Sequence, residues 1–444
     1  MKKRKILKSC SLLMLGVLGT LSKAEAMQPK IWEESLFGWF LASRNTVMRW
    51  GMRILASELP EDAQHAPRHP GLQCLCISAS VGKLEEACFA DCLSFIFVAF
   101  EANSQLVTVE QSAFRGCSSL SSICLPASVE TLGYSCFSRC SSLAHAAFEF
   151  GSQLMEIGEY AFSHSGLHSA TLPMSVREIG KGCFVQCQSL AFVTFRVGSP
   201  LTILRESVFN TSGLQSVTIP ASVERIEKEC FLYCSPLVDI TFAAGSRLMI
   251  IKGGAFQGTR DQSIDLPAGV GKLDKGCFSH CLALACFNFV KNSQLRVVGE
   301  KAFFRAGLRS MVLPDGVEVL GEWCFMDCLS LTSVSFGVHS RVAQIKKGAF
   351  AHSGILNIII PRGVTILRKQ CFASCFSLTF IAFEVASRLE EIEAGAFTGS
   401  PQAQVALPPE GEVRSAVRLD QGWQRASLNQ TPTGYLLQPS RGSG

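Results

Sequence analysis

A repeat of 47 residues dominates this sequence. Leu-Pro or Ile-Pro dipeptides recur at that interval, from Leu125-Pro126 to Leu407-Pro408. A Cys-Phe-x-x-Cys element keeps the same step from Cys136 to Cys371, and a further copy at Cys88 lies one residue out of phase. Each unit divides into two similar halves, of about 22 and 25 residues, and the second half has Ala or Val in place of the first cysteine. The anchoring phenylalanines are Phe89, Phe114, Phe137, Phe162, Phe184, Phe209, Phe231, Phe256, Phe278, Phe303, Phe325, Phe350, Phe372 and Phe397.

The spacing within one half predicts how a single coil folds. Residues 214–220 alternate apolar and polar side chains, which indicates a short strand with one buried face. Pro220 ends the strand because it has no N–H to donate. Ile226 and Phe231 then point inward from a turn, a 3-10 turn or a short helical segment. Because one coil cannot enclose its own apolar face, we predict a leucine-rich-repeat solenoid of about 14 stacked coils over residues 72–410.

The recurring element resembles a known family. Its pattern is Ala-Phe-x-x-Ser/Cys-x-x-Leu-x-x-Val-x-Leu/Ile-Pro-x-x-Val-x-x-Ile-Gly, and residues 118–133 are a clear instance. This pattern is similar to the BspA-type leucine-rich repeat, best known from bacterial and protist surface antigens. The strict alternation of two coil lengths and the cysteine before phenylalanine depart from the nearly uniform coil of that family. The resemblance covers about residues 72–410; it implies binding to host proteins or other cells, and no substrate or reaction.

The first 26 residues are typical of a secretory signal peptide. Basic residues between Lys2 and Lys8 precede an apolar stretch at 11–21, which is too short to span a bilayer, and Ala24-Glu25-Ala26 is a small-x-small cleavage site. This leader holds six of the 41 basic residues and one of the 36 acidic residues, so 35 of each remain in the rest of the chain. The predicted mature protein is therefore neutral and shows no electrostatic footprint for nucleic acid.

The segments that flank the repeats are short. Residues 27–71 are predicted to form a helical cap and a linker, because apolar residues between Ile31 and Leu55 fall roughly at helical spacing. Arginines among them leave open a second interpretation, in which residues 31–55 contact a membrane surface. Residues 411–444 are expected to form a degenerate last coil and a disordered tail.

Twenty cysteines are present, and fourteen of them form Cys-x-x-x-Cys pairs. Equivalent thiols on alternate coils lie about two strand spacings apart, roughly 9–10 Å, which exceeds the reach of a disulfide or a shared zinc ion. We therefore interpret them mainly as small buried core residues. Cys92, Cys117 and Cys140 occupy equivalent positions on three consecutive coils, so a disulfide of Cys117 with Cys92 or Cys140 is a specific hypothesis. No metal site is predicted.

The outward positions of the predicted strands form a candidate binding face. Their side chains are small and mostly uncharged, and they become more apolar toward the C-terminal half. A flat surface of this kind suits contact with another protein, although the strand preference of Thr and Val alone would also explain it. The positions are Thr171, Thr194, Thr218, Thr241, Asp265, Asn288, Val312, Ser335 and Ile359.

No catalytic motif accompanies this row. The sequence lacks Gly-x-Ser-x-Gly, His-Glu-x-x-His, P-loop and Gly-x-Gly-x-x-Gly elements. We therefore predict no catalytic residue and no cofactor, and expect a secreted or cell-surface module that recognises host or neighbouring-cell proteins. Two alternatives remain: an effector delivered into a host cell, or a structural spacer of the envelope. An exported protein with many free thiols is expected either to bury them, so that they are protected from oxidation, or to function in a reducing compartment.

Overall fold

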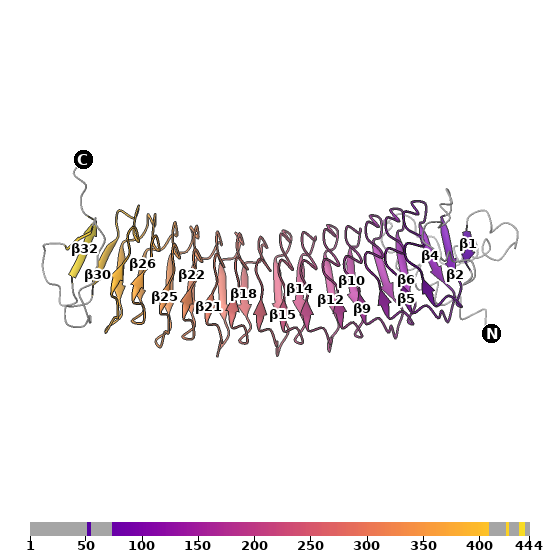
Figure 1. Ribbon diagram of the computed structural model, residues 1–444, viewed down its shortest axis with the longest axis horizontal. Helices are drawn as coiled ribbons and strands as arrows, with labels where there is room; N and C mark the ends of the chain where they lie inside the picture. Colours follow the sequence, from indigo (N-terminus) through magenta and orange to yellow (C-terminus); the bar gives the residue numbers. More distant parts are fainter. Residues whose placement is uncertain (1–50, 55–72, 408–422, 426–434, 440–444) are drawn as a thin grey trace, which may run out of the picture.

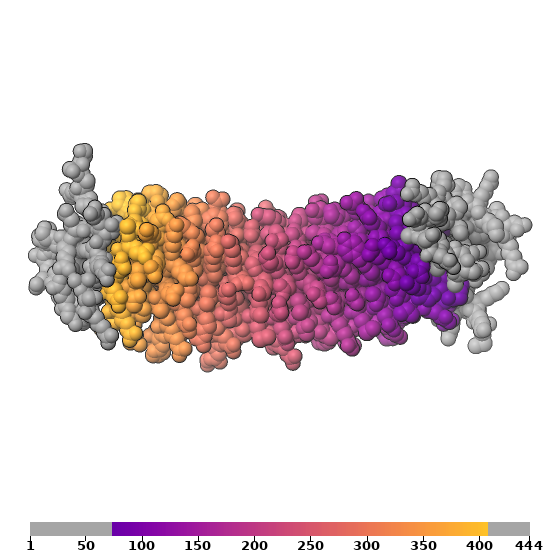
Figure 2. Space-filling model, viewed as in Figure 1, coloured from indigo at the N-terminus to yellow at the C-terminus, as the bar shows by residue number. Residues whose placement is uncertain are grey.

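The computed structural model describes residues 51–54, 73–407, 423–425 and 435–439. Figure 1 shows an elongated solenoid whose strands lie across its long axis, with the N-terminal and C-terminal coils at opposite ends. The space-filling view in Figure 2 shows the same coils closely packed into one continuous rod. The predicted leucine-rich-repeat solenoid of about 14 coils is confirmed.

Each coil contributes a strand of four residues and a strand of two residues. The four-residue strands form what we call the long-strand face, and they are β2 (Cys74–Ile77), β4 (Phe97–Phe100), β6 (Ser122–Leu125), β8 (His145–Phe148), β10 (Ser169–Leu172), β12 (Phe192–Phe195), β14 (Ser216–Ile219), β16 (Asp239–Phe242), β18 (Ser263–Leu266), β20 (Cys286–Phe289), β22 (Ser310–Leu313), β24 (Ser333–Phe336), β26 (Asn357–Ile360), β28 (Phe380–Phe383) and β30 (Gln404–Leu407).

The two-residue strands form the short-strand face. They are β3 (Lys83–Leu84), β5 (Thr108–Val109), β7 (Thr131–Leu132), β9 (Glu156–Ile157), β11 (Glu178–Ile179), β13 (Ile203–Leu204), β15 (Arg225–Ile226), β17 (Ile250–Ile251), β19 (Lys272–Leu273), β21 (Val297–Val298), β23 (Val319–Leu320), β25 (Gln344–Ile345), β27 (Ile366–Leu367) and β29 (Glu391–Ile392).

Neighbouring coils pair in parallel, and the pairing is interrupted at a few places. The long strands form three sheets, from β1 (Gly51–Ile54) to β16, β18 with β20, and β22 to β32 (Tyr435–Pro439), while the short strands form two, β3 to β11 and β13 to β29. In β14, Val217 and Ile219 are buried and Thr218 is exposed, as the alternation in sequence predicts. Pro220 follows directly, and the chain turns toward the short strand.

The segment around each phenylalanine contains no helix in the described residues, so of the predicted possibilities the turn is the one adopted. In one coil, Ser135 and Arg139 have positive φ angles of 52° and 60°, two residues before and after Phe137. The N–H groups of Phe137 and Arg139 donate to carbonyls of the next coil, at 2.8 Å each, while that of Ser138 donates to Ser135 of its own coil. In a helix all three N–H groups would bond within the segment, whereas in this turn two of the three join neighbouring coils.

The core is a continuous stack of the anchoring phenylalanines. Successive rings have centroids 5.2–5.7 Å apart and lie within 23° of parallel, and the stack continues through all fourteen coils. The aliphatic residues of the strands surround these rings in one hydrophobic cluster. Burial of a large apolar side chain in every coil is the main favourable term that offsets the ordering of the chain.

Both ends of the solenoid carry additional strands. Residues 51–54 form β1 (Gly51–Ile54), which pairs in parallel with β2, so these four residues of the predicted helix are a strand. β32 (Tyr435–Pro439) pairs antiparallel with β30 and with β31 (Trp423–Arg425), where we expected a disordered tail. The predicted signal peptide at 1–26 and the other residues of 27–71 and 411–444 lie outside the described residues.

Candidate binding surface

The nine predicted binding positions lie in one row along the long-strand face. Each occupies the third residue of its strand and is exposed, because the strand alternation turns it away from the core. The registers place Thr171 opposite Thr194 and Val312 opposite Ser335. The solenoid thus brings residues that are far apart in the sequence into one row, which crosses the two interruptions of the long-strand sheets.

Polar members of the row bond to one another across neighbouring strands. The hydroxyl oxygens of Thr218 and Thr241 lie 2.9 Å apart, and the Asn288 amide donates to Asp265 Oδ1 at 2.8 Å. These contacts partly satisfy the polar groups of the middle coils. The C-terminal members Val312 and Ile359 have apolar side chains that cannot form hydrogen bonds.

An apolar patch occupies the C-terminal part of this face. The exposed fractions are 65% for Val312, 60% for Ile359, 44% for Leu356 and 40% for Phe380. Val312 and Ile359 are among the outward positions predicted from the sequence, whereas Leu356, which precedes its strand, and Phe380, the first residue of its strand, are not. We call these four residues the apolar patch. Contiguous exposed apolar groups are a common feature of surfaces that contact another protein, whereas single ones such as Phe97 and Phe192 on the same face are ordinary.

A shallow pocket of about 520 Å³ separates the apolar patch from the polar middle of the face. It lies at the interruption between β20 and β22, and Cys286, Asn288 and Val312 are among its lining residues. Phe287 is the inward residue of β20, and its ring packs edge-on against Phe278 and Phe303 at 5.0 and 4.9 Å. The interruption coincides with this large ring, where most other coils have a smaller side chain.

The paired cysteines are interior residues, as predicted, and many of them also act as hydrogen-bond donors. Cys140, Cys187, Cys234 and Cys328 donate through Sγ to the phenylalanine carbonyl of the preceding coil, at 2.9–3.1 Å. Ser400 makes the equivalent bond with its hydroxyl at 2.7 Å. This position takes small side chains, and most of them carry a donor, although Ala306 occupies it in one coil.

Burial makes these thiols poor nucleophiles. Desolvation raises the pKa of Cys187, Cys234 and Cys281 to about 11, although hydrogen bonds from neighbouring Ser or Thr groups oppose it. Because the thiolate is the reactive form, these cysteines are chemically protected at neutral pH.

Cys117 and Cys140, two of the three cysteines in the disulfide hypothesis, are thiols in this structure. Cys92, Cys117 and Cys140 are buried, and Cys117 Sγ donates to the carbonyl of Phe89 at 3.1 Å. Desolvation, followed by Coulombic interaction with Cys140 and Cys92, raises the pKa of Cys117. These interactions place the three thiols close together, and a disulfide of Cys117 stays a prediction.

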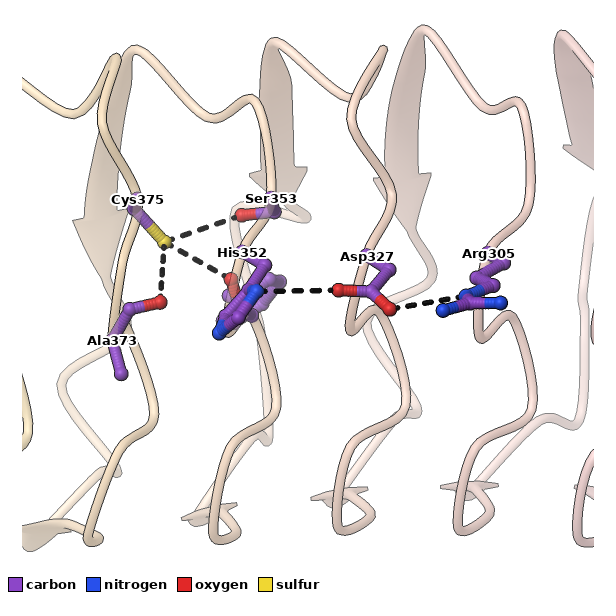
Figure 3. A network of polar contacts seen from close by, with 7 residues as sticks. Arg305, Asp327, His352, Ser353, Ala373 and Cys375 are labelled. Atoms are coloured by element: carbon purple, nitrogen blue, oxygen red, sulfur yellow. Dashed lines mark hydrogen bonds and ion pairs between the residues drawn. The ribbon is translucent and has the colours of Figure 1, made fainter.

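Some titratable side chains in the turns around the anchoring phenylalanines contact one another from coil to coil. Figure 3 shows Asp327 between two neighbours: Arg305 Nε lies 3.1 Å from Oδ2, and His352 Nδ1 lies 3.4 Å from Oδ1. The hydroxyl of Ser353 faces Cys375 Sγ in the interior, at 3.5 Å, rather than the imidazole. Within the described residues no three His, Cys, Asp or Glu side chains are grouped so as to hold a metal ion. The arrangement is a surface ion network.

In the part of the chain that the structure describes, no helix has the length and apolar character that crossing a membrane requires.

The chain is similar to several solved structures. A leucine-rich repeat protein from Bacteroides ovatus ATCC 8483 is 21% identical with a TM-score of 0.60, over 82% of this chain and 93% of that chain. A leucine-rich cell surface protein from Faecalibacterium prausnitzii A2-165 is 22% identical with a TM-score of 0.39, over 83% of each chain. The pneumococcal vaccine antigen PcpA is 18% identical with a TM-score of 0.41, over 80% of this chain and 81% of that chain. No curated protein matches the chain.

The sequence also matches a model of the BspA-type leucine-rich repeat region. The matched segments, 69–191, 155–285, 202–332 and 296–412, together span the solenoid. They exceed half of the 444 residues. This chain belongs to the BspA-type leucine-rich repeat family.

Proposed function

We propose that this chain is an exported protein-recognition module that binds a partner protein on its long-strand face. The observation that carries the proposal is the apolar patch of Val312, Leu356, Ile359 and Phe380. The core of a protein interface is enriched in apolar and aromatic groups, and its rim is polar. Asn288 and Ser335, the polar row positions beside the patch, supply such a rim.

The rigidity of the face supports the same proposal. Its strands are paired with neighbouring coils and lie over the stacked phenylalanines, so the exposed side chains are held in fixed positions. A preorganised surface loses less conformational entropy when a partner binds. Leucine-rich repeats are commonly protein-binding modules, and membership of the family agrees with this use of the surface.

Export is part of the proposal and rests on the signal-peptide pattern of residues 1–26. The thiols of the solenoid are compatible with an oxidising space, because most are buried and their pKa values are raised. The burial removes the main argument for a reducing destination. We therefore favour a secreted or surface location, with adhesion to host or neighbouring cells as the specific role, over an effector delivered into a host cell.

Location is tested by protease shaving of intact source cells, with solenoid peptides identified by mass spectrometry. We expect their release while an internal marker protein stays intact. Protected peptides from cells that contain the protein would contradict a surface location and direct attention to the effector or spacer alternatives.

Binding is tested with purified protein and candidate target cells, by flow cytometry. The variant V312E/I359E places two charges in the apolar patch, and T171E/T218E places two charges at the same strand position in the N-terminal half. We expect saturable binding that the first variant loses and the second retains. A spacer would show no saturable binding, and equal loss in both variants would contradict the assignment of the patch.

A further inference from the structure

The short-strand face carries a concentration of positive charge that the proposed protein-binding face does not explain. Two repeat positions, the fourth and third residues before each anchoring phenylalanine, follow the short strand directly. In the neighbouring coils of Phe350 and Phe372 these positions are Lys346, Lys347, Arg368 and Lys369. The four residues contribute four positive charges and no negative charge, whereas every other pair of neighbouring coils has at most one net positive charge there.

These residues line a groove. The groove has a volume of about 570 Å³ and runs over β25 and β27, where Gln344, Ile345 and Ile366 form its floor together with Thr365. Glu322 and Glu393 are the two carboxylates in its lining. We call this feature the basic groove. It is built mainly from the side chains of two coils, so its positive groups lie about one coil spacing, ~5 Å, apart along the solenoid.

Much of the positive charge is left without a partner. Glu393 is engaged by Arg368, with Nη1 and Oε1 2.6 Å apart, and by the backbone N–H of Lys369 at 2.9 Å. Burial raises the pKa of Glu393, but these hydrogen bonds and the nearby positive charges outweigh it and hold the pKa below its usual value. Among the described residues, no carboxylate lies within ion-pair distance of the ammonium groups of Lys346, Lys347 or Lys369.

Trp323 positions one of these lysines. The Lys347 ammonium lies 5.3 Å from the centre of the indole ring, which attracts it through the negative face of the ring. The indole rests on Gly348, where a Cβ atom would come within 1.9 Å of the ring and where φ is +62°. Glycine is therefore required beneath the tryptophan. The contact holds Lys347 beside the groove without neutralising its charge.

The geometry points to an anionic glycan, one bearing sulfate or carboxylate groups on successive sugars, as the ligand of the basic groove. Positive groups in adjacent coils can meet successive anionic substituents along such a chain. A nucleic acid duplex fits less well, because it needs an extended basic field, and outside the predicted leader the chain has 35 basic and 35 acidic residues. The inference concerns a different face from the proposed protein-binding surface and does not depend on it.

The test compares two variants with equal changes of charge. K346E/K369E replaces two positive charges of the basic groove by negative ones. Lys346 is the fourth residue before Phe350, and Lys369 is the third residue before Phe372 in the next coil. K252E/K228E makes the same reversals at the same repeat positions in the coils of Phe256 and Phe231, where Glu227 and Glu229 balance the charge. Binding of the full chain and both variants to immobilised heparin, a sulfated glycan, is measured against neutral dextran over a series of salt concentrations. Thermal unfolding confirms that both variants fold.

We expect binding to heparin and none to dextran. The groove variant should bind about tenfold or more weakly, since each basic residue near an anionic surface contributes on the order of 1 kcal/mol. It should also lose part of the salt dependence, while the control variant stays within about twofold of the parent. Absence of heparin binding, or equal weakening in both variants, would overturn the proposal. Equally tight binding of duplex DNA would overturn the assignment of a glycan, and full competition by inorganic sulfate would show a site for small anions instead.

Discussion

The stack of phenylalanines predicts a measurable coupling between neighbouring coils. Phe231 is fully buried between Phe209 and Phe256, with ring centroids 5.2 Å away on each side. Phe231→Leu keeps an apolar side chain but removes both ring contacts. An aromatic pair stabilises by about 0.5–1.5 kcal/mol beyond its buried area, so we expect the two lost contacts to contribute about 1–3 kcal/mol to the destabilisation.

A double-mutant cycle isolates one contact. In F231L/F256L the shared contact is lost only once, so the double variant should be less destabilised than the sum of the single variants by about 0.5–1.5 kcal/mol. The control pair F231L/F325L lies four coils apart and should be additive within about 0.5 kcal/mol.

The assay is equilibrium unfolding in urea with a reducing agent, followed by circular dichroism. Stabilities are compared only if the urea dependence of the unfolding free energy is the same for all variants, because a repeat protein can depart from two-state unfolding. Additivity of the neighbouring pair, or equal coupling in the distant pair, would refute the idea that contacts between adjacent rings carry this part of the stability.

Three further predictions concern single positions. Cys234→Ala removes one of two donors to the carbonyl of Phe209, which still accepts from the N–H of Ser212 at 3.0 Å, and should destabilise by about 0.5–1.5 kcal/mol, whereas Cys234→Ser should cost less; urea unfolding of the two variants side by side decides whether the donor matters. Iodoacetamide at pH 8 should label the exposed Cys286 in the native protein and reach Cys234 only in denaturant, as peptide mass spectrometry would reveal; early labelling of Cys234 would contradict its burial. Asp261 occupies a position that is Leu or Ile in related coils, and burial raises its pKa, so its ionised form opposes folding as pH rises. D261L should therefore raise the melting temperature more at pH 7 than at pH 4, and a thermal-melting comparison showing the reverse order would refute this reasoning.

The disulfide hypothesis for Cys117 can be tested directly. Mass spectrometry of unreduced peptides detects any disulfide that joins Cys117 to Cys92 or Cys140. Detection of Cys117 only as a free thiol would remove the disulfide hypothesis and agree with the thiol seen in the structure.

The sequence alone determined the architecture, because a regular repeat leaves few arrangements of the chain that bury all its apolar residues. Phenylalanines at a fixed spacing can be buried only if successive coils place them in register, and alternation within a strand decides which side chain faces outward. The nine row positions such as Thr218 and Val312 were predictable for this reason. The burial of the cysteines followed from the same spacing.

Only the tertiary structure decided what joins one coil to the next. The turn at Phe137 replaces a helical segment because its N–H groups have better partners in the neighbouring coil, which a single repeat does not reveal. The interruption between β16 and β18 has a similar origin, since the Asp261 carboxylate accepts N–H groups from Ile240 and Ser263. The basic groove arises because stacking places Lys346 and Lys369 side by side, although 22 residues separate them in the chain. Local pattern sets which way each side chain points, whereas stacking sets which side chains meet.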